Sequence, residues 1–244
     1  MDTIKINCSN VKMVAHRGVS GLETENTCAA FVAAGNRSYY GIECDVHVTS
    51  DGRFAVIHDD NTARVCAENY TVEDTPYEVL RSLRLYDMSL KGKKSELLRA
   101  DCVIPELKDY ISICRKYGKV AVLELKNPMA EDDVCRIAET IDEMDYLNGT
   151  VFISFAWDNL VYLRKHYPDT RVQFLTSKLD NGLVERLAEN RFDLDIHYSA
   201  VSGELVSLIH ETGLEINCWT VDDPETAQRM IECGVDYITT NILE

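Results

Sequence analysis

The chain has 244 residues, 45% hydrophobic and 27% charged, proportions typical of a soluble globular protein that can bury a substantial core. Its formal net charge of −16 argues against nucleic acid or an anionic membrane as a primary partner. No run approaches the roughly 18 apolar residues of a membrane span, and no secretory signal is visible, so we expect a cytoplasmic protein without stable membrane insertion. Nine scattered cysteines with no C-x-x-C pair favour reduced thiols over a disulfide framework or a zinc site.

Strand-like apolar runs recur along the chain, with amphipathic segments of helical length between most of them. This alternation predicts a parallel sheet, and eight repeats predict a closed (β/α)8 TIM barrel in one domain over residues 1–244. An open doubly wound sheet would need a Gly-rich first turn, which the segment HRGVSG does not supply. The eight expected strands are residues 11–15, 40–48, 119–125, 151–155, 171–175, 193–197, 215–218 and 237–240.

Acidic residues stand near the ends of two expected strands. Glu43 and Asp45 lie two apart in the second strand and therefore share a face. Two acids on one face of an apolar strand repel and desolvate each other unless a cation is present, which is the pattern of a metal site. Glu124 closes the third strand and would lie at the same mouth of the barrel. Three carboxylates suit one divalent cation, Mg²⁺ or Ca²⁺, whereas the competing interpretation pairs these acids with lysines such as Lys126.

Two histidines also fall at expected strand ends. His16 follows the first strand, and His58 lies beyond the second, next to Asp59. Because imidazole titrates near neutrality, one histidine can take a proton from attacking water while the other protonates the leaving group. The residues alone do not say which histidine has which role. Arg17 offers a planar fork for two phosphate oxygens, or alternatively forms an ion pair with a barrel acid.

These motifs together resemble the glycerophosphodiester phosphodiesterase family. The resemblance rests on the segments HRG, ENTCAAF, IECDVHVTSDG, VIHDD, IPELKDYI, VLELK, ISFAWDNL and WTVDD, which occur in the family's order. It implies the TIM-barrel fold, catalysis by His16 and His58, a metal role for Glu124 and phosphate contact by Lys126. It also implies that Trp219 forms an aromatic wall against the glycerol, with core packing as the competing interpretation.

Two positions depart from the family's usual pattern. Thr24 stands where a proline is usual before the ENT segment, and Asn241 stands where the last strand is usually followed by aspartate. Both changes concern loop geometry and fine substrate contacts. Neither removes a residue of the expected catalytic set.

Residues 60–104 interrupt the alternation, because the interval is far too long for a barrel loop of a few residues. The resemblance implies an inserted cap there, which can also mediate contacts in a homo-oligomer. Basic residues gather near its end, where they form either a solvated surface or a patch that draws an anionic substrate toward the mouth. These residues are Arg81, Arg84, Lys91, Lys93, Lys94 and Arg99.

We therefore expect a phosphoric diester hydrolase that converts a small-molecule glycerophosphodiester to sn-glycerol 3-phosphate and an alcohol. The substrate class comes from the resemblance, since the residues alone indicate only metal-assisted phosphoryl transfer. One alternative is a lysophospholipase D-like or sphingomyelinase D-like phosphodiesterase, although no membrane-binding segment stands out. Another is a non-catalytic glycerophosphodiester-binding protein, which would need a missing catalytic residue.

Overall fold

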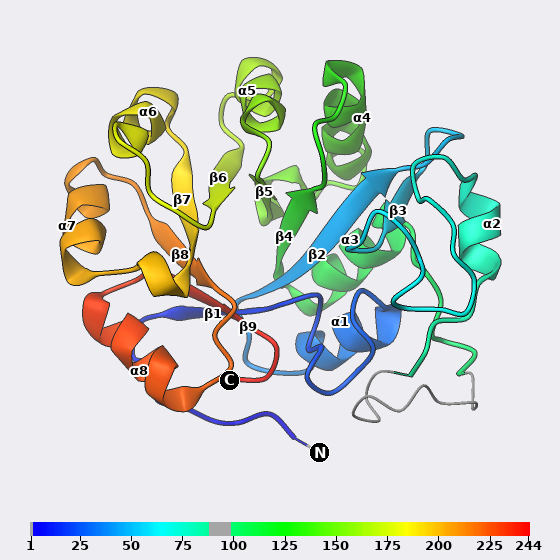
Figure 1. Ribbon diagram of the computed structural model, residues 1–244, viewed down its shortest axis with the longest axis horizontal. Coiled ribbons are helices and arrows are strands. Elements are labelled where there is room, and N and C mark those ends of the chain that lie inside the picture. The colour runs from blue at the N-terminus through cyan, green and yellow to red at the C-terminus, as the bar shows by residue number, and fades with distance from the viewer. Residues whose placement is uncertain (1, 88–98) are drawn as a thin grey trace.

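Eight parallel strands close into a barrel with the helices arranged around it (Figure 1). The strand order is β1, β9, β8, β7, β6, β5, β4, β2, and pairing between β1 and β2 closes the ring. The computed structural model describes residues 2–87 and 99–244, and it confirms the (β/α)8 barrel expected from the sequence. The parallel strands are β1 (Lys12–Ala15), β2 (Gly41–Val48), β4 (Val120–Leu125), β5 (Thr150–Ser154), β6 (Arg171–Thr176), β7 (Asp193–His197), β8 (Ile216–Trp219) and β9 (Tyr237–Thr240).

The helices begin where local capping chemistry favours it. The Thr27 hydroxyl accepts a hydrogen bond from the N–H of Ala30 at the start of α1, and Asp223 caps α8, whose first residue is Pro224. No helix among the described residues is long and apolar enough to cross a membrane. The helices of the barrel are α1 (Cys28–Gly35), α3 (Leu107–Tyr117), α4 (Glu131–Asp142), α5 (Trp157–His166), α6 (Leu183–Asn190), α7 (Gly203–Glu211) and α8 (Pro224–Cys233), with short 3-10 turns η2 (Leu147–Gly149) and η3 (Tyr198–Ala200).

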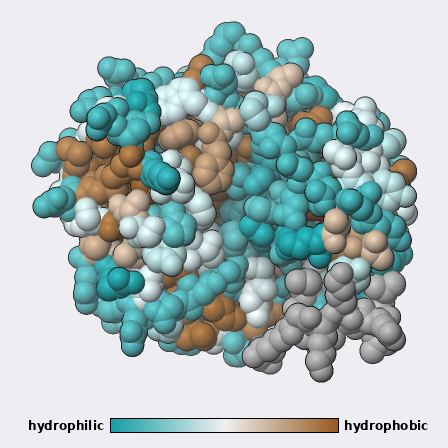
Figure 2. All heavy atoms as spheres, in the orientation of Figure 1, coloured by the Kyte–Doolittle hydropathy of each residue, from teal (hydrophilic) through white to brown (hydrophobic). Residues whose placement is uncertain are grey.

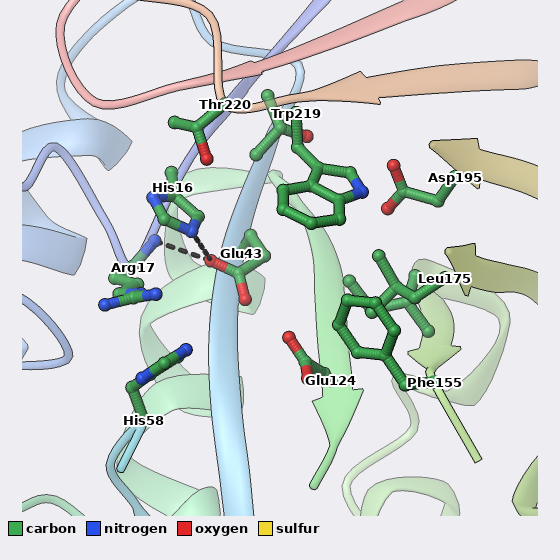
Figure 3. Close-up of a pocket in the computed structure, with 12 residues that line it drawn as sticks. His16, Arg17, Glu43, His58, Glu124, Phe155, Leu175, Asp195, Trp219 and Thr220 are labelled. Carbon is green, nitrogen blue, oxygen red and sulfur yellow. Dashed lines mark hydrogen bonds and ion pairs between the residues drawn. The ribbon is translucent and has the colours of Figure 1, made fainter. Parts of the chain in front are cut away.

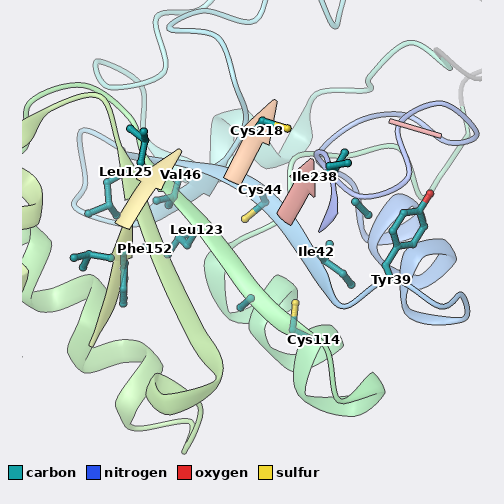
Figure 4. Close-up of a cluster of buried hydrophobic side chains, with 14 of the residues drawn as sticks. Tyr39, Ile42, Cys44, Val46, Cys114, Leu123, Leu125, Phe152, Cys218 and Ile238 are labelled. Atoms are coloured by element: carbon teal, nitrogen blue, oxygen red, sulfur yellow. The ribbon is translucent and has the colours of Figure 1, made fainter. Parts of the chain in front are cut away.

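Strand β2 separates an apolar environment from a polar one. Ile42, Cys44 and Val46 belong to the main hydrophobic core between barrel and helices (Figure 4), whereas the alternate residues Glu43 and Asp45 point to the barrel interior. The Tyr110 hydroxyl of α3 donates to the Ile42 carbonyl at 2.7 Å and so ties that helix to the strand. The face seen in Figure 2 carries many hydrophilic residues, with hydrophobic residues gathered on its left side.

The sequence did not predict β3 (Phe54–Val56), which returns antiparallel to β2. A tight turn joins them, in which Gly52 has a φ of +74° and the Arg53 N–H donates to the Thr49 hydroxyl at 3.0 Å. Three residues are too few to give a readable period, although Asp51-Gly52 is a common hairpin signal. The hairpin matters because it carries the chain back along β2 to Asp45, whose carbonyl accepts from the Ile57 N–H, and so places His58 next to the carboxylates.

The segment between β3 and α3 has an apolar cluster of its own, built around α2 (Tyr77–Ser82). Leu80 is fully buried in this cluster, together with residues from the hairpin and from the end of the insertion. Of the expected basic patch, Arg81 donates to the Ile104 carbonyl and Arg99 pairs with Glu23. Lys91, Lys93 and Lys94 lie outside the described residues.

The insertion cluster yields a stability prediction. We expect Leu80→Ala to lower the free energy of unfolding by about 2–4 kcal/mol, because it leaves a cavity in a closed apolar cluster. Val79→Ala is the matched control on the same helix, since Val79 is exposed and its loss should cost less than about 0.5 kcal/mol. Urea denaturation of both variants makes the comparison, and equal effects would show that the cluster does not stabilise the fold.

Candidate active site

One pocket opens at the carboxyl ends of the strands, where barrel enzymes build their active sites. Side chains from β2, the turn after β1 and the residues after β3 line one part of it, and side chains from or just after strands β4 to β9 line the rest (Figure 3). The lining residues are His16, Arg17, Glu43, His58, Glu124, Ile153, Phe155, Leu175, Asp195, Trp219, Thr220 and Thr239. The structure thus brings most of the residues expected from the sequence to a single cavity.

Glu43, Asp45 and Glu124 form a compact carboxylate cluster. Each offers an oxygen within 4.8 Å of the others, and all three side chains are buried. The register of the sheet explains the arrangement, because Asp45 on β2 pairs directly with Glu124 on β4. Asp45 Oδ1 has no hydrogen-bond partner among the described residues. Converging buried carboxylate oxygens, one of them without a hydrogen bond, fit a hard divalent cation.

Burial and neighbouring charges shift the pKa values of all three carboxyl groups in the cluster. Burial, with the charges of Asp45 and Glu124, raises the pKa of Glu43 well above its usual range. Burial and Asp45 likewise raise the pKa of Glu124 to about 7. Burial would raise the pKa of Asp45 too, but Arg17 and Lys126 outweigh it and hold this pKa well below its usual range. Additional positive charge at this position would favour all three ionised forms.

Two positively charged side chains, Lys126 and Arg17, contact the carboxylate cluster. Lys126 Nζ lies 2.8 Å from Glu124 Oε1 and 3.5 Å from Asp45 Oδ1. Lys126 therefore forms ion pairs with these acids, as one of the two interpretations of the sequence expected. Arg17 Nε lies 3.5 Å from Asp45 Oδ2, and its Nη1 donates to Glu25 at 2.9 Å. Arg17 lines the pocket, whereas Lys126 is not among the lining residues. Arg17 therefore combines an ion pair with access to a ligand.

A tight turn after β1 places Arg17. Both Arg17 and Gly18 have positive φ angles, of 53° and 75°. A Cβ on Gly18 would lie 2.6 Å from that of Ala30, so only glycine fits against α1. The turn is fixed to β2 because the Arg17 N–H donates to Glu43 Oε2 at 2.7 Å. The HRG segment therefore supplies the backbone conformation of the turn as well as the side chains of His16 and Arg17.

The ENT segment supports the site from beside this turn. Glu25 binds Arg17, and Asn26 Nδ2 donates to Asp45 Oδ2 at 2.7 Å. Thr27 then caps α1. Thr24, at the position where proline is usual, is buried, and its carbonyl accepts from the Thr27 hydroxyl at 2.6 Å. Glu25 thus holds Arg17, Asn26 holds Asp45, and Thr27 begins α1.

The orientation of His16 is fixed by Asn241, which follows β9. Asn241 Nδ2 donates to Asp222 at 2.6 Å, so its Oδ1 faces His16 and accepts from Nδ1 at 2.7 Å. The Ser20 hydroxyl donates to the same oxygen at 2.6 Å. In the neutral ring Nδ1 therefore carries the proton and Nε2 the lone pair, 4.0 Å from Glu43 Oε2. Burial and the neighbouring Arg17 lower the pKa of His16 to about 4.

His58 has a carboxylate partner instead. Its Nδ1 lies 2.6 Å from Asp59 Oδ1, and Arg64 of the insertion donates to both Asp59 oxygens at 2.6 and 3.1 Å. Arg64 also donates to both oxygens of Glu25, at 2.8 and 2.7 Å, and Glu25 in turn binds Arg17. Burial raises the pKa of Asp59, but Arg64 and His58 outweigh it and bring the value to about 2. Asp59 is therefore an anion beside His58.

Aromatic side chains form the opposite wall. The ring of Trp219 meets that of Phe155 edge to face, with centroids 5.7 Å apart, and it makes a similar contact with His197 at 5.2 Å. Trp219 is partly buried against the barrel interior and also lines the pocket, so both interpretations of this residue describe part of its surroundings.

The model of the glycerophosphoryl diester phosphodiesterase family matches residues 16–244. The chain belongs to this family of hydrolases. A glycerophosphodiester phosphodiesterase of Caldanaerobacter subterraneus is 30% identical over 94% of this chain and 93% of its own length. An uncharacterized protein of Mycoplasma genitalium is 43% identical, with 90% of each chain covered.

A solved structure extends the comparison. It is a phosphodiesterase of Oleispira antarctica in complex with the product sn-glycerol-3-phosphate, 26% identical to this chain. The alignment covers 94% of this chain and 92% of the other, with a TM-score of 0.83.

Several polar residues in and around the site of this family member were not expected from its sequence. Arg64 and Asp222 act through other side chains, and a charged residue in an insertion or loop gives no periodic signal. Asn241 was noted only as a departure from the pattern. Asp195 lines the pocket from β7, and the alternation in the strand sequence DLDIH, with Asp193, Asp195 and His197 on one face, was a signal that could have revealed it.

The carboxylate cluster of this phosphodiesterase family member predicts stabilisation by a divalent cation. After chelator treatment, Mg²⁺ or Ca²⁺ at about 100 times its dissociation constant should raise the melting temperature by about 5–10 °C, because the ion binds only the folded cluster. Glu124→Gln should lose most of this shift, whereas the control Asp193→Asn, at the other end of β7, should keep it. The same shift in both variants would place the cation elsewhere.

Proposed function

We propose that this protein hydrolyses glycerophosphodiesters to sn-glycerol 3-phosphate and an alcohol. The reaction would use one bound divalent cation, with His16 and His58 as the acid–base pair. The observation that carries the proposal is the convergence of His16, His58, Arg17 and the buried carboxylate cluster on one pocket. Family membership supports it, as does the relative whose solved structure holds sn-glycerol-3-phosphate.

Glu43, Asp45 and Glu124 would hold the cation. Once bound, Mg²⁺ or Ca²⁺ supplies a Lewis acid that polarises a phosphate oxygen and offsets charge in the transition state. Arg17 lines the pocket and can direct its guanidinium to a phosphate oxygen while Glu25 holds it in place. Lys126 supplies positive charge from behind the cluster.

The hydrogen bonds of the two histidines favour different roles. With its Nδ1 proton donated to Asn241, His16 presents the Nε2 lone pair, which suits a base that takes a proton from attacking water. His58 has the Asp59 carboxylate on Nδ1, which stabilises an imidazolium and suits an acid that protonates the leaving alkoxide. We therefore assign His16 as general base and His58 as general acid.

The direct test measures release of glycerol 3-phosphate from glycerophosphocholine by chelator-stripped protein, before and after Mg²⁺ or Ca²⁺ is restored. Release should require the cation. His16→Ala and His58→Ala should each lower kcat by about 10²- to 10⁴-fold with unchanged melting temperature. Cation-independent release, or near-wild-type turnover in either variant, would contradict the proposal.

A substrate with a better leaving group tests the separate roles. The p-nitrophenyl ester of glycerol 3-phosphate releases a phenolate that leaves without being protonated, so the acid becomes dispensable and the base does not. His58→Ala should then recover to within about 10-fold of the wild type, while His16→Ala stays impaired. Recovery of His16→Ala instead would reverse the assignment.

A further inference from the structure

One arginine of the insertion is hydrogen-bonded to two carboxylates at once. Arg64 donates to both oxygens of Asp59, from Nε at 2.6 Å and from Nη2 at 3.1 Å. It also donates to both oxygens of Glu25, from Nη1 at 2.8 Å and from Nη2 at 2.7 Å. The planar fork of arginine permits two such paired contacts, whereas the single ammonium group of lysine does not.

Each of these carboxylates holds a residue of the pocket. Asp59 Oδ1 lies 2.6 Å from His58 Nδ1, and Glu25 Oε1 accepts from Arg17 Nη1 at 2.9 Å. A continuous series of contacts therefore runs from His58 through Asp59, Arg64 and Glu25 to Arg17. Its two ends are among the residues that line the pocket, on the same side in Figure 3, and its three middle members are not. Arg64 thus touches the site only through other side chains.

The position of Arg17 depends on Glu25. Among the described residues the Arg17 guanidinium donates one hydrogen bond, to Glu25, while its Nε lies 3.5 Å from Asp45 Oδ2 without forming one. Burial raises the pKa of Glu25, but Arg64 and Arg17 outweigh it and bring that pKa below its usual range, so Glu25 is an anion. Without Arg64, Glu25 keeps only one of the three hydrogen bonds that the two arginines donate to it. Asp45 then competes better for Arg17 and draws it away from the pocket.

The orientation of His58 depends on Asp59 in the same way. Arg64 binds both Asp59 oxygens and so prevents the carboxylate from turning. The Asp59 side chain is 26% exposed, so water replaces the histidine as its partner once Arg64 is gone. A general acid is effective only while its ring is directed at the leaving oxygen, so a mobile Asp59 weakens proton donation by His58.

We infer that Arg64 is a positioning residue for two parts of the site. Its fork fixes Asp59 and Glu25 relative to each other, and thereby orients the acid His58 and the phosphate-binding Arg17 together. This inference rests on the proposed function and adds to it a residue outside the pocket.

The kinetic test replaces Arg64 by Met, which keeps an apolar stem and removes every donor. With glycerophosphocholine, kcat should fall roughly 10- to 100-fold and KM should rise about 3- to 10-fold, because neither the acid nor Arg17 is held. With the p-nitrophenyl ester of glycerol 3-phosphate, which needs no acid, kcat should stay within about 3-fold of the wild type while the rise in KM persists. An equal loss of kcat on the two esters would overturn the inference, as would an unchanged KM.

Arg99→Met is the matched control. Arg99 also reaches from the insertion to this segment, where its Nη1 donates to Glu23 at 2.6 Å, and it pairs with Asp101. Glu23 is not among the residues that line the pocket. Both variants loosen the insertion and should lower the melting temperature, but Arg99→Met should leave kcat and KM within about 2-fold of the wild type. The same kinetic losses in Arg99→Met would show that any weakening of the insertion impairs the site, and would contradict a specific role of Arg64.

Binding without turnover separates this inference from the proposed function. Calorimetry with the Mg²⁺- or Ca²⁺-loaded protein measures the dissociation constant of glycerol 3-phosphate in the wild type, Arg64→Met, Arg17→Met and the double variant. Loss of Arg64 should weaken binding roughly 3- to 10-fold in the wild type and less than about 2-fold when Arg17 is already replaced, because its effect passes through Arg17. Equal weakening in both backgrounds would overturn the inference. Failure to cleave any diester while this binding pattern is kept contradicts the proposed function alone.

Discussion

The arrangement of this protein's site depends on the close burial of three carboxylates inside the barrel. Glu43, Asp45 and Glu124 repel one another at less than 5 Å, and burial penalises each charge further. The surrounding groups act to offset that cost. Arg17 and Lys126 approach the cluster as cations, and Asn26 and the Arg17 N–H donate hydrogen bonds to it. Electrostatic compensation therefore explains why cations and hydrogen-bond donors surround the carboxylate cluster.

Barrel closure supplies the second constraint. β1 pairs with both β2 and β9, so residues near the two ends of the sequence meet at one edge of the pocket. His16 consequently takes its orientation from Asn241, far along the chain, while His58 takes its orientation from its sequence neighbour Asp59. A neutral amide and a carboxylate thus support chemically identical rings. Burial lowers the pKa of both histidines, and the hydrogen bonds to Asn241 and Asp59 each offset part of that shift.

Much of this could be read from the sequence, and the reasons are physical. A period of two placed Glu43 and Asp45 on one face, and the strand–helix alternation predicted the barrel with strand bounds close to those observed. The three-residue strand β3 was too short to show a period. Arg64 and Asn241 contribute through contacts between distant segments, which no local pattern encodes. Asp195 had a readable alternation, but its unpaired Oδ1 becomes visible only when burial is known.

The hydrogen bonds from Arg64 to Glu25 join the insertion to the turn after β1. The Glu25 carboxylate accepts hydrogen bonds from both Arg64 and Arg17. It therefore couples the insertion to the turn after β1. Local opening of the insertion breaks the two hydrogen bonds from Arg64 to Asp59 and two of the three that Arg64 and Arg17 donate to Glu25. A molecule that binds the insertion more tightly when Arg64 contacts Glu25 must, by reciprocity, also stabilise the contact between Glu25 and Arg17. Binding to the insertion and the placement of Arg17 are thus thermodynamically linked through Glu25.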